Sequence, residues 1–272
     1  MIVAQITDPH VRANGRLAYR KVDTFAALKA CIDHVNALDH APDAVVVSGD
    51  VTDFGTPEEY ATARPLLDEL SMPYYVIPGN HDDRETMRHA FADHRYLPGS
   101  GFIHYAIDDY AVRLVGLDTV VAGEQYGEMC RERIEWLESC LSEDQDKPTL
   151  VFMHHPPFLT GIRHMDWQNC RNSTALANVI AKHPQVKMVA CGHVHRAIET
   201  QWAGTVASIC PAPCHAVALD LADDPEPAFA VEPPACRLFY LNDEQRLVAH
   251  LSYIGSFDGP HPFFNADGSL ID

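Results

Sequence analysis

Short apolar runs that alternate with helix-like stretches constrain most strongly how this 272-residue chain can fold. Runs rich in Val, Ile and Tyr occur at 2–6, 44–47, 74–77, 112–117, 150–153 and 186–190. Their length and β-branching favour buried strands over helices. Helical patterns lie between them, at 22–38, 57–70, 84–91, 131–141 and 174–182. This rhythm predicts an α/β fold with helices outside the sheet.

The pattern changes after about residue 195. Residues 200–256 indicate a run of strands, at 204–209, 216–220, 236–241 and 247–253. A connection rich in Pro and Asp at 223–227 predicts an exposed loop between two of them. The tail from residue 255 is rich in Gly, Pro and aromatic residues and predicts no regular element.

Clusters of metal-competent side chains directly follow five of the predicted strands. They are Asp8-Pro9-His10, Gly49-Asp50, Gly79-Asn80-His81-Asp82, His154-His155 and Gly192-His193-Val194-His195. The carboxyl ends of strands in an open α/β sheet form the edge where ligands bind, so the five clusters are expected to meet there. Each cluster alone is more typical of a turn. Five in succession, all at strand ends, are hard to obtain from turns alone.

The residue types indicate divalent metal ions. Carboxylates and imidazoles suit Mn, Fe, Co and Zn, whereas sites made only of oxygen suit Mg or Ca. One carboxylate can bridge two ions, and two ions about 3.5–4 Å apart can hold the attacking and leaving oxygens of a phosphoryl displacement. The clusters therefore predict a two-metal site suited to phosphoester hydrolysis.

The charge of the chain excludes some partners. The formal net charge is -18, from 38 acidic and 20 basic side chains. Such a surface repels nucleic-acid polymers and anionic membranes, although bound metal ions would still admit a small anionic substrate. Eight cysteines without CxxC spacing are expected to be free thiols, and the N-terminus lacks the features of a signal peptide. We therefore expect a cytoplasmic protein.

On these five clusters the sequence resembles the calcineurin-like metallophosphoesterases. It is more closely similar to bacterial glycerophosphodiesterases and class III cyclic-nucleotide phosphodiesterases, through residues 43–50, 77–83 and 152–157. The resemblance implies two divalent ions per subunit, each bound by four side chains with one carboxylate shared. The implied ligands are Asp8, His10, Asp50 and His195 for one ion, and Asp50, Asn80, His154 and His193 for the other.

The resemblance also implies roles for residues around the metals. Metal-bound hydroxide would attack the phosphorus, and His81 would act as a catalytic residue outside the coordination sphere. Asn80, His81 and His215 would face the substrate, with a surface-loop histidine as the alternative for His215. Asp53 and the acids at 82 and 83 are candidates for orienting ligating histidines, with solvated loop acids as the alternative.

For the fold, the resemblance implies a four-layer αββα sandwich. Residues 1–199 would form the catalytic domain, and 200–256 a β-rich cap or dimerisation segment with strand edges suited to pairing between chains. The tail, 257–272, could return to the catalytic domain. We accordingly expect a homo-oligomer, either a dimer or an assembly of dimers.

One position bears on the class of phosphoester. Protein phosphatases of the family carry an Arg in a Gly-Asp-x-x-Asp-Arg-Gly pattern, and Phe54 replaces it here. Because Arg grips a dianionic monoester in bidentate fashion, its loss favours small phosphodiesters. The sequence leaves glycerophosphodiesters and 3',5'-cyclic nucleotides both open. One alternative is a promiscuous phosphomonoesterase. The other is an inactive, metal-free scaffold, and the complete ligand set disfavours the scaffold.

Overall fold

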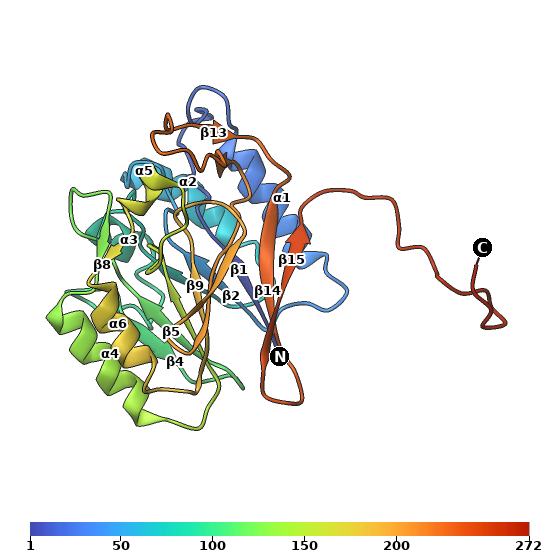
Figure 1. Ribbon diagram of the computed structural model, residues 1–272. Coiled ribbons are helices and arrows are strands. Elements are labelled where there is room, and N and C mark those ends of the chain that lie inside the picture. The colour runs from blue at the N-terminus through green and yellow to red at the C-terminus, as the bar shows by residue number, and fades with distance from the viewer. Residues whose placement is uncertain (272) are drawn as a thin grey trace.

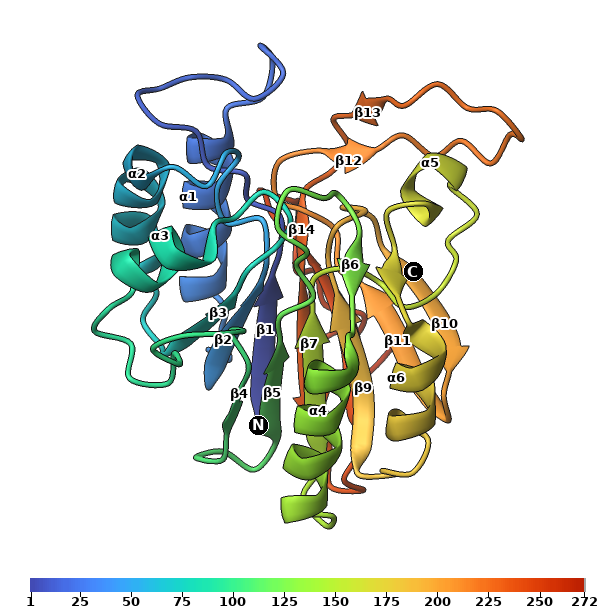
Figure 2. The same ribbon diagram turned by 90° about the vertical axis from the view of Figure 1, so that its left-hand side faces the viewer.

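Two β-sheets pack face to face in this protein, and helices cover their outer faces (Figure 1 and Figure 2). The computed structural model describes residues 1–271. The first sheet has the order β15-β14-β1-β2-β3, and the second the order β10-β11-β9-β7-β5-β4. These layers confirm the predicted αββα sandwich.

Parallel strands form the centre of each sheet, and antiparallel strands complete it. In the first sheet, β1 (Ile2–Ile6), β2 (Ala44–Ser48) and β3 (Tyr74–Ile77) are parallel, whereas β14 (Ala235–Leu241) and β15 (Leu247–Tyr253) are antiparallel additions. In the second sheet, the parallel strands are β5 (Arg113–Leu117), β7 (Thr149–Met153), β9 (Val186–Cys191) and β11 (Thr205–Ile209). Its antiparallel edges are β4 (Tyr105–Ile107) and β10 (Ile198–Trp202).

The helices divide between the two outer faces. Figure 2 shows α1 (Thr24–Asn36), α2 (Pro57–Leu67) and α3 (Arg84–Ala90) beside the first sheet, and α4 (Arg131–Glu143) and α6 (Ser173–Ile180) beside the second. A short helix, α5 (Arg163–Asp166), and the strand pairs β6 (Gly127–Glu128) with β8 (Cys170–Arg171) and β12 (Ala216–Val217) with β13 (Phe229–Ala230) lie outside these layers. None of the helices within residues 1–271 combines the length and apolarity needed to cross a bilayer.

Burial on both faces explains the uninterrupted apolar runs of the central strands. On β7, Phe152 belongs to the core cluster that includes side chains of both sheets, whereas Val151 and Met153 pack with α4 and α6. Successive residues of a strand point to opposite faces, so a strand covered on both sides needs apolar residues throughout.

Residues 200–256 do not form a unit apart from the sandwich, and their expected role as a cap or dimerisation segment stays a prediction. Four of their strands are members, wholly or in part, of the two main sheets: β10 and β11 extend the second sheet, and β14 and β15 extend the first. The physical reason is burial, because Phe239 on β14 is inaccessible and pairs with Val3 on β1. The predicted strand 216–220 is limited to β12, which pairs with β13.

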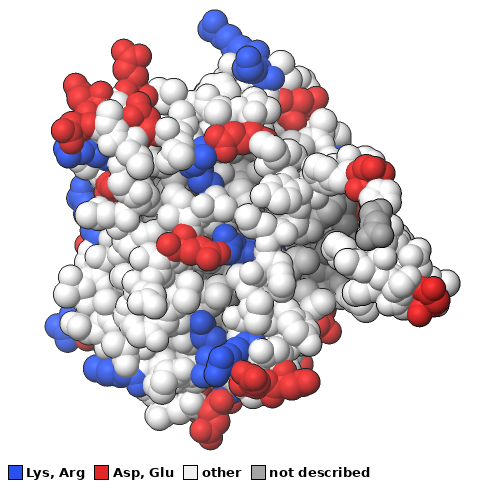
Figure 3. All heavy atoms as spheres, turned by 45° about the vertical axis from the view of Figure 1, so that its right-hand side comes forward, with Lys and Arg blue, Asp and Glu red and all other residues white. Residues whose placement is uncertain are grey.

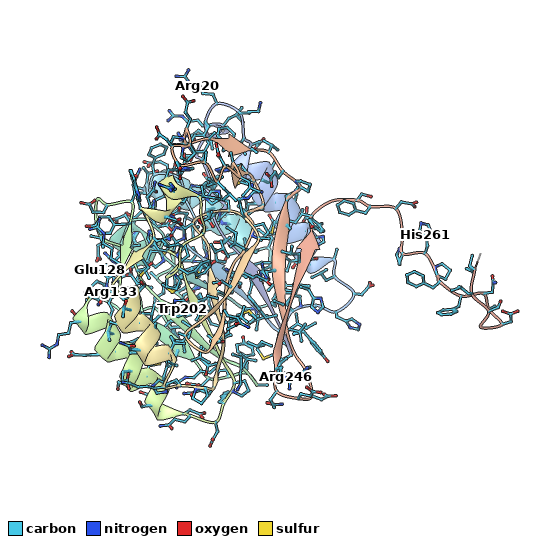
Figure 4. All side chains as sticks on the ribbon, in the orientation of Figure 1. Arg20, Glu128, Arg133, Trp202, Arg246 and His261 are labelled. Atoms are coloured by element: carbon cyan, nitrogen blue, oxygen red, sulfur yellow. The ribbon has the colours of Figure 1, made fainter. Side chains whose placement is uncertain are left out.

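The tail leaves the body after Ile254. Residues 255–271 are exposed and extend away from the sandwich, as Figure 1 and Figure 3 show, and Figure 4 labels His261 along this extension. Its exposed apolar side chains include Phe257, Phe263 and Phe264. The described part of the tail thus does not return to the catalytic half of the sandwich.

The placement of β14 predicts unequal costs of substitution in its hairpin. Phe239→Ala should lower the free energy of unfolding by about 3–5 kcal/mol, because it leaves a cavity in the shared core. Tyr240→Ala, in the same hairpin but 42% exposed, should change it by no more than about 0.5 kcal/mol. Denaturant titration measures both values, and a small cost for Phe239→Ala would contradict the integration of β14 into the first sheet.

Candidate metal centre

All seven predicted metal ligands lie at one end of the sandwich, where strands of both sheets end. The first sheet supplies those that follow β1, β2 and β3, and the second sheet supplies those that follow β7 and β9. The residues are Asp8, His10, Asp50 and Asn80 from the first sheet and His154, His193 and His195 from the second. Six of the seven are buried, and Asn80 is partly exposed.

One group of ligands surrounds the ends of β1 and β9. His195 Nε2 lies 3.3 Å from Asp8 Oδ1 and 3.2 Å from His10 Nε2. His10 Nε2 in turn lies 3.5 Å from Asp50 Oδ2. These four side chains match the first predicted ligand set.

A second group meets at the other side of Asp50. His154 Nε2 lies 3.3 Å from Asp50 Oδ2 and 3.1 Å from Asn80 Oδ1. The rings of His154 and His193 are 5.2 Å apart between centroids. The same carboxylate oxygen of Asp50 therefore faces both groups, as a bridging ligand requires.

The donor atoms fit divalent ions on physical grounds. His193 Nε2 is buried without a hydrogen-bond partner among residues 1–271, which costs about 1–3 kcal/mol unless a cation satisfies it. The His10 and His195 nitrogens point at each other at 3.2 Å, so they must share a proton or face a common cation. Carboxylate, imidazole and amide oxygen donors together suit Mn, Fe, Co or Zn.

Close approach explains two glycines of the motifs. A Cβ on Gly79 would lie 2.2 Å from Asp50 Oδ1, and a Cβ on Gly192 would lie 2.1 Å from Thr7 Oγ1. Any side chain at either position would push one ligand loop away from the other. These glycines let loops from different strands converge.

Most of the ligands have unusual backbone conformations. Positive φ angles occur at five of the seven: Asp8 (52°), His10 (46°), Asp50 (48°), His193 (73°) and His195 (57°). Non-glycine residues adopt this left-handed region at a cost of about 1 kcal/mol or more each, and such strain concentrates at functional sites. The surrounding strands must hold these turns in place.

His81 lies beside the ligands without belonging to either group. Its backbone N–H donates to Asp50 Oδ1 at 2.8 Å, and its Nδ1 lies 2.8 Å from the backbone oxygen of Asp53. Burial lowers the pKa of His81, but the charge of Asp50, the hydrogen bond to the Asp53 backbone and the charge of Asp53 together outweigh burial, and the net shift is upward. Because a carbonyl only accepts, Nδ1 carries a proton and Nε2 is the free nitrogen.

The three neighbouring acids have different contacts. The Asp53 carboxylate lies 3.2 Å from His10 Nδ1 and accepts from Arg12 at 2.7 Å, so it orients a predicted ligand. Asp82 instead accepts from backbone N–H groups, including those of Val51 and Gly79, and holds two ligand loops together. Asp83 caps the N-terminus of α3 and contacts no ligating histidine.

His155 is adjacent to the metal ligands but both of its ring nitrogens are occupied. Nδ1 lies 2.7 Å from Thr119 Oγ1, and Nε2 lies 3.2 Å from the backbone oxygen of Gln125. It therefore offers no free nitrogen to an ion, although its ring lies 4.7 Å from that of His193.

A cavity of about 590 Å³ contains the exposed side of the ligand groups. His215 lines it and is buried, 4.6 Å from the His195 ring, so the alternative of a surface-loop histidine is wrong. Burial, with the rings of His195 and His10, lowers the pKa of His215, which leaves it neutral.

The wall of this cavity beyond the predicted metal ligands carries no signal in the sequence. Tyr19 and Phe229 form an aromatic pair with ring centroids 5.0 Å apart, and Gln125 and Gln168 add polar groups. These residues come from loops and short elements without periodic pattern, so no local signal marks them. Phe54, in contrast, lies outside the cavity, with the Arg12 guanidinium 4.4 Å from its ring.

The charge arrangement predicts a pH dependence of metal binding. Burial alone would lower the pKa of His154, but the charge of Asp50 and a hydrogen bond to it raise the pKa to about 9 in the metal-free protein. Its contribution to stability is therefore fully present below pH 6.5 and lost as the pH rises through about 9. An ion must displace this proton, so apparent metal affinity should rise with pH up to about 9. Calorimetric metal titrations between pH 6.5 and 9 measure it, and a pH-independent affinity would contradict the site.

Sequence comparisons agree with this geometry. The family model of the calcineurin-like phosphoesterases matches residues 1–197. The chain is 44% identical over 273 residues to a probable glycerophosphodiester phosphodiesterase GpdQ of Arcobacter nitrofigilis, with 100% of both chains covered. It is 29% identical over 212 residues to the 3',5'-cyclic adenosine monophosphate phosphodiesterase CpdA of Escherichia coli K12, covering 78% of this chain and 76% of that one.

Solved structures agree on the fold. A dimetal phosphatase from Danio rerio superposes with a TM-score of 0.69 over 92% of this chain and 95% of that one, at 16% identity. Similarity at this level shows the shared architecture, and the family match rests on the sequence. With the family model spanning most of the chain, the protein belongs to the calcineurin-like phosphoesterase family.

Proposed function

We propose that this protein is a two-metal phosphodiesterase that hydrolyses small phosphodiesters. The observation that carries the proposal is the convergence of six predicted ligand side chains around a seventh, Asp50, beside a cavity larger than a phosphate group. In this proposal Asp8, His10 and His195 complete one metal site. Asn80, His154 and His193 complete the other.

The residues and the ions have separate tasks. Two ions, when bound, would neutralise charge on the phosphate and acidify a water that attacks the phosphorus. Asp50 holds the two positions together, and Asp53 fixes the ring of His10. In its protonated form His81 would donate Nδ1–H to the Asp53 carbonyl and Nε2–H to the leaving oxygen, and so assist departure as a hydrogen-bond donor or general acid; the raised pKa of His81 favours this form.

The cavity favours diesters over monoesters. None of the described residues that line it is Lys or Arg. The nearby Arg12 pairs with Asp53 at 2.7 Å and Glu59 at 3.3 Å and stacks on Phe54. A dianionic monoester needs an additional cation to balance its second charge, and this cavity offers none. A monoanionic diester does not need that cation.

Among diesters, we propose glycerophosphodiesters as the first substrate class. The full-length relatives from Arcobacter nitrofigilis and Enterobacter lignolyticus are named glycerophosphodiester phosphodiesterases, the second at 36% identity over 96% of this chain and 94% of that one. Cyclic nucleotides are the second candidate, favoured by the Tyr19–Phe229 pair, on which a flat base could stack. A metal-free scaffold is disfavoured because no ligand position is missing.

The remaining parts of the chain suggest a cap and a dimer contact. The β12–β13 pair brings Phe229 over the cavity and is our candidate for the cap. β15 is the last strand of its sheet, and Leu251 and Tyr253 on it are exposed, which suits pairing with a second copy.

All eight cysteines are free, which supports the proposed reducing, cytoplasmic compartment. The charge of -18 supports the absence of a nucleic-acid partner.

Hydrolysis of model esters tests the proposed function. After EDTA treatment and addition of Mn²⁺, Co²⁺, Fe²⁺ or Zn²⁺, we expect cleavage of bis(p-nitrophenyl) phosphate to exceed that of p-nitrophenyl phosphate, because the cavity lacks an extra cation. A strong monoester preference would overturn the diester assignment. Folded protein that cleaves neither ester with any metal would favour the scaffold.

Two substitutions separate metal binding from catalysis. Asp50→Ala should abolish both, since each ion loses a ligand, and retention of two ions would contradict the bridging role. His81→Ala should keep near-normal metal content and lower kcat by about 10²–10⁴-fold. Measurement of metal content and of kinetics distinguishes the two variants. If His81→Ala lost metal and activity to the same extent, His81 would have to be counted among the metal ligands.

Light scattering tests the proposed dimer. The full chain should elute as a dimer or a multiple of dimers, whereas Leu251→Lys with Tyr253→Lys should shift it to monomer, because like charges would face each other across the paired edge. The doubly substituted Lys29→Glu and Lys187→Glu protein provides a control with altered surface charge elsewhere. A monomeric full chain at all concentrations would contradict the proposal.

A further inference from the structure

His155 is buried beside the metal ligands, yet the catalytic scheme does not use it. Its ring contacts the loop at 119–128, which runs from the end of β5 to α4. Both ends of this loop are fixed by arginines. Arg84 Nη2 donates to the backbone oxygen of Val120 at 2.5 Å, and Arg133 Nη1 donates to that of Glu128 at 2.7 Å. Figure 4 labels Glu128 and Arg133 next to each other.

The hydrogen bonds of His155 define its tautomer. Nε2 faces the backbone oxygen of Gln125 at 3.2 Å, and a carbonyl only accepts, so Nε2 carries the proton. In the neutral ring Nδ1 is then an acceptor, and it receives the Thr119 hydroxyl at 2.7 Å. His155 thus links the start of the loop to the residue near its tip.

Gly127 shows how closely the loop encloses this ring. A Cβ at Gly127 would lie 2.5 Å from both Cγ and Nδ1 of His155. Gly127 itself belongs to β6, which pairs in parallel with β8. The loop is therefore closed around the imidazole, and the position of Gln125 depends on it.

Gln125 is the part of this loop that reaches the substrate cavity. It lines the cavity, as do Gln168 and His164. The Gln168 amide nitrogen donates to the backbone oxygen of His164, which leaves its oxygen as an acceptor. A carboxamide such as Gln125 offers both a donor and an acceptor, the pair that recognises an alcohol hydroxyl.

We propose that Gln125, held in place by the Thr119–His155 contact, is a specificity-determining residue that recognises a hydroxyl group on an alcohol arm of the substrate. His155 and Thr119 are positioning residues that act through Gln125. The inference rests on the proposed phosphodiesterase function, and it selects diesters of hydroxylated alcohols over diesters of alcohols without hydroxyl groups.

Equilibrium binding of two phosphate monoesters tests this role without requiring turnover. Calorimetry on the metal-loaded protein should show glycerol 3-phosphate binding about three- to tenfold more tightly than methyl phosphate, the range of one hydrogen bond. Gln125→Ala should remove this preference. Thr119→Val should reduce it, because the variant lacks the hydroxyl that holds His155, and Thr119→Ser should restore it.

Each other outcome has a distinct meaning. The inference is overturned if the native protein does not prefer glycerol 3-phosphate, or if Gln125→Ala keeps the preference. It is also overturned if Thr119→Val weakens both ligands equally and loses metal, since His155 would then support its neighbour His154 instead. If the native protein shows the preference but hydrolyses no diester, the role of Gln125 in recognising a hydroxyl group stands, and only the proposed phosphodiesterase function is contradicted.

Discussion

The candidate site depends on one buried carboxylate. Asp50 Oδ2 faces His10 on one side and His154 on the other, while Oδ1 accepts the backbone N–H of His81. Burial alone would raise the pKa of Asp50, but the histidines around it, His154 first, hold it well below its usual range. Asp50 therefore remains charged, and both predicted metal positions and the proposed catalytic histidine are arranged around that charge.

A rigid frame is needed to keep this arrangement. The five positive φ angles among the ligands would relax if the strands beneath them were free to move. Those strands are buried on both faces, and Asp82 joins the turns after β2 and β3 by accepting from their N–H groups. Packing of the sandwich thus offsets strain that is concentrated at its catalytic end.

Local features of this fold and site are predictable from the sequence, whereas features that depend on contacts between distant residues are not. Residues that follow apolar runs could be placed at strand ends, since the run itself marks the strand. The pairing of β14 with β1 joins Ile2 to Tyr240, and nothing near either residue indicates it. Tyr19, Gln125 and Phe229 were not predicted, because they come from loops and short elements. Such segments show no periodic pattern of apolar residues. The glycines of the motifs could be seen, but the reason for Gly79 and Gly192 needed coordinates.

The division of the ligands between the two sheets has a consequence for biosynthesis. Those from the first sheet are contained in residues 8–80, whereas the others appear only at 154–195. A growing chain thus exposes the predicted ligands of the first sheet long before those of the second sheet are synthesised. The ligands of the first sheet alone do not form a complete coordination shell. In the proposed site, ion capture would therefore be a late event in maturation, which follows the docking of the second sheet on the first.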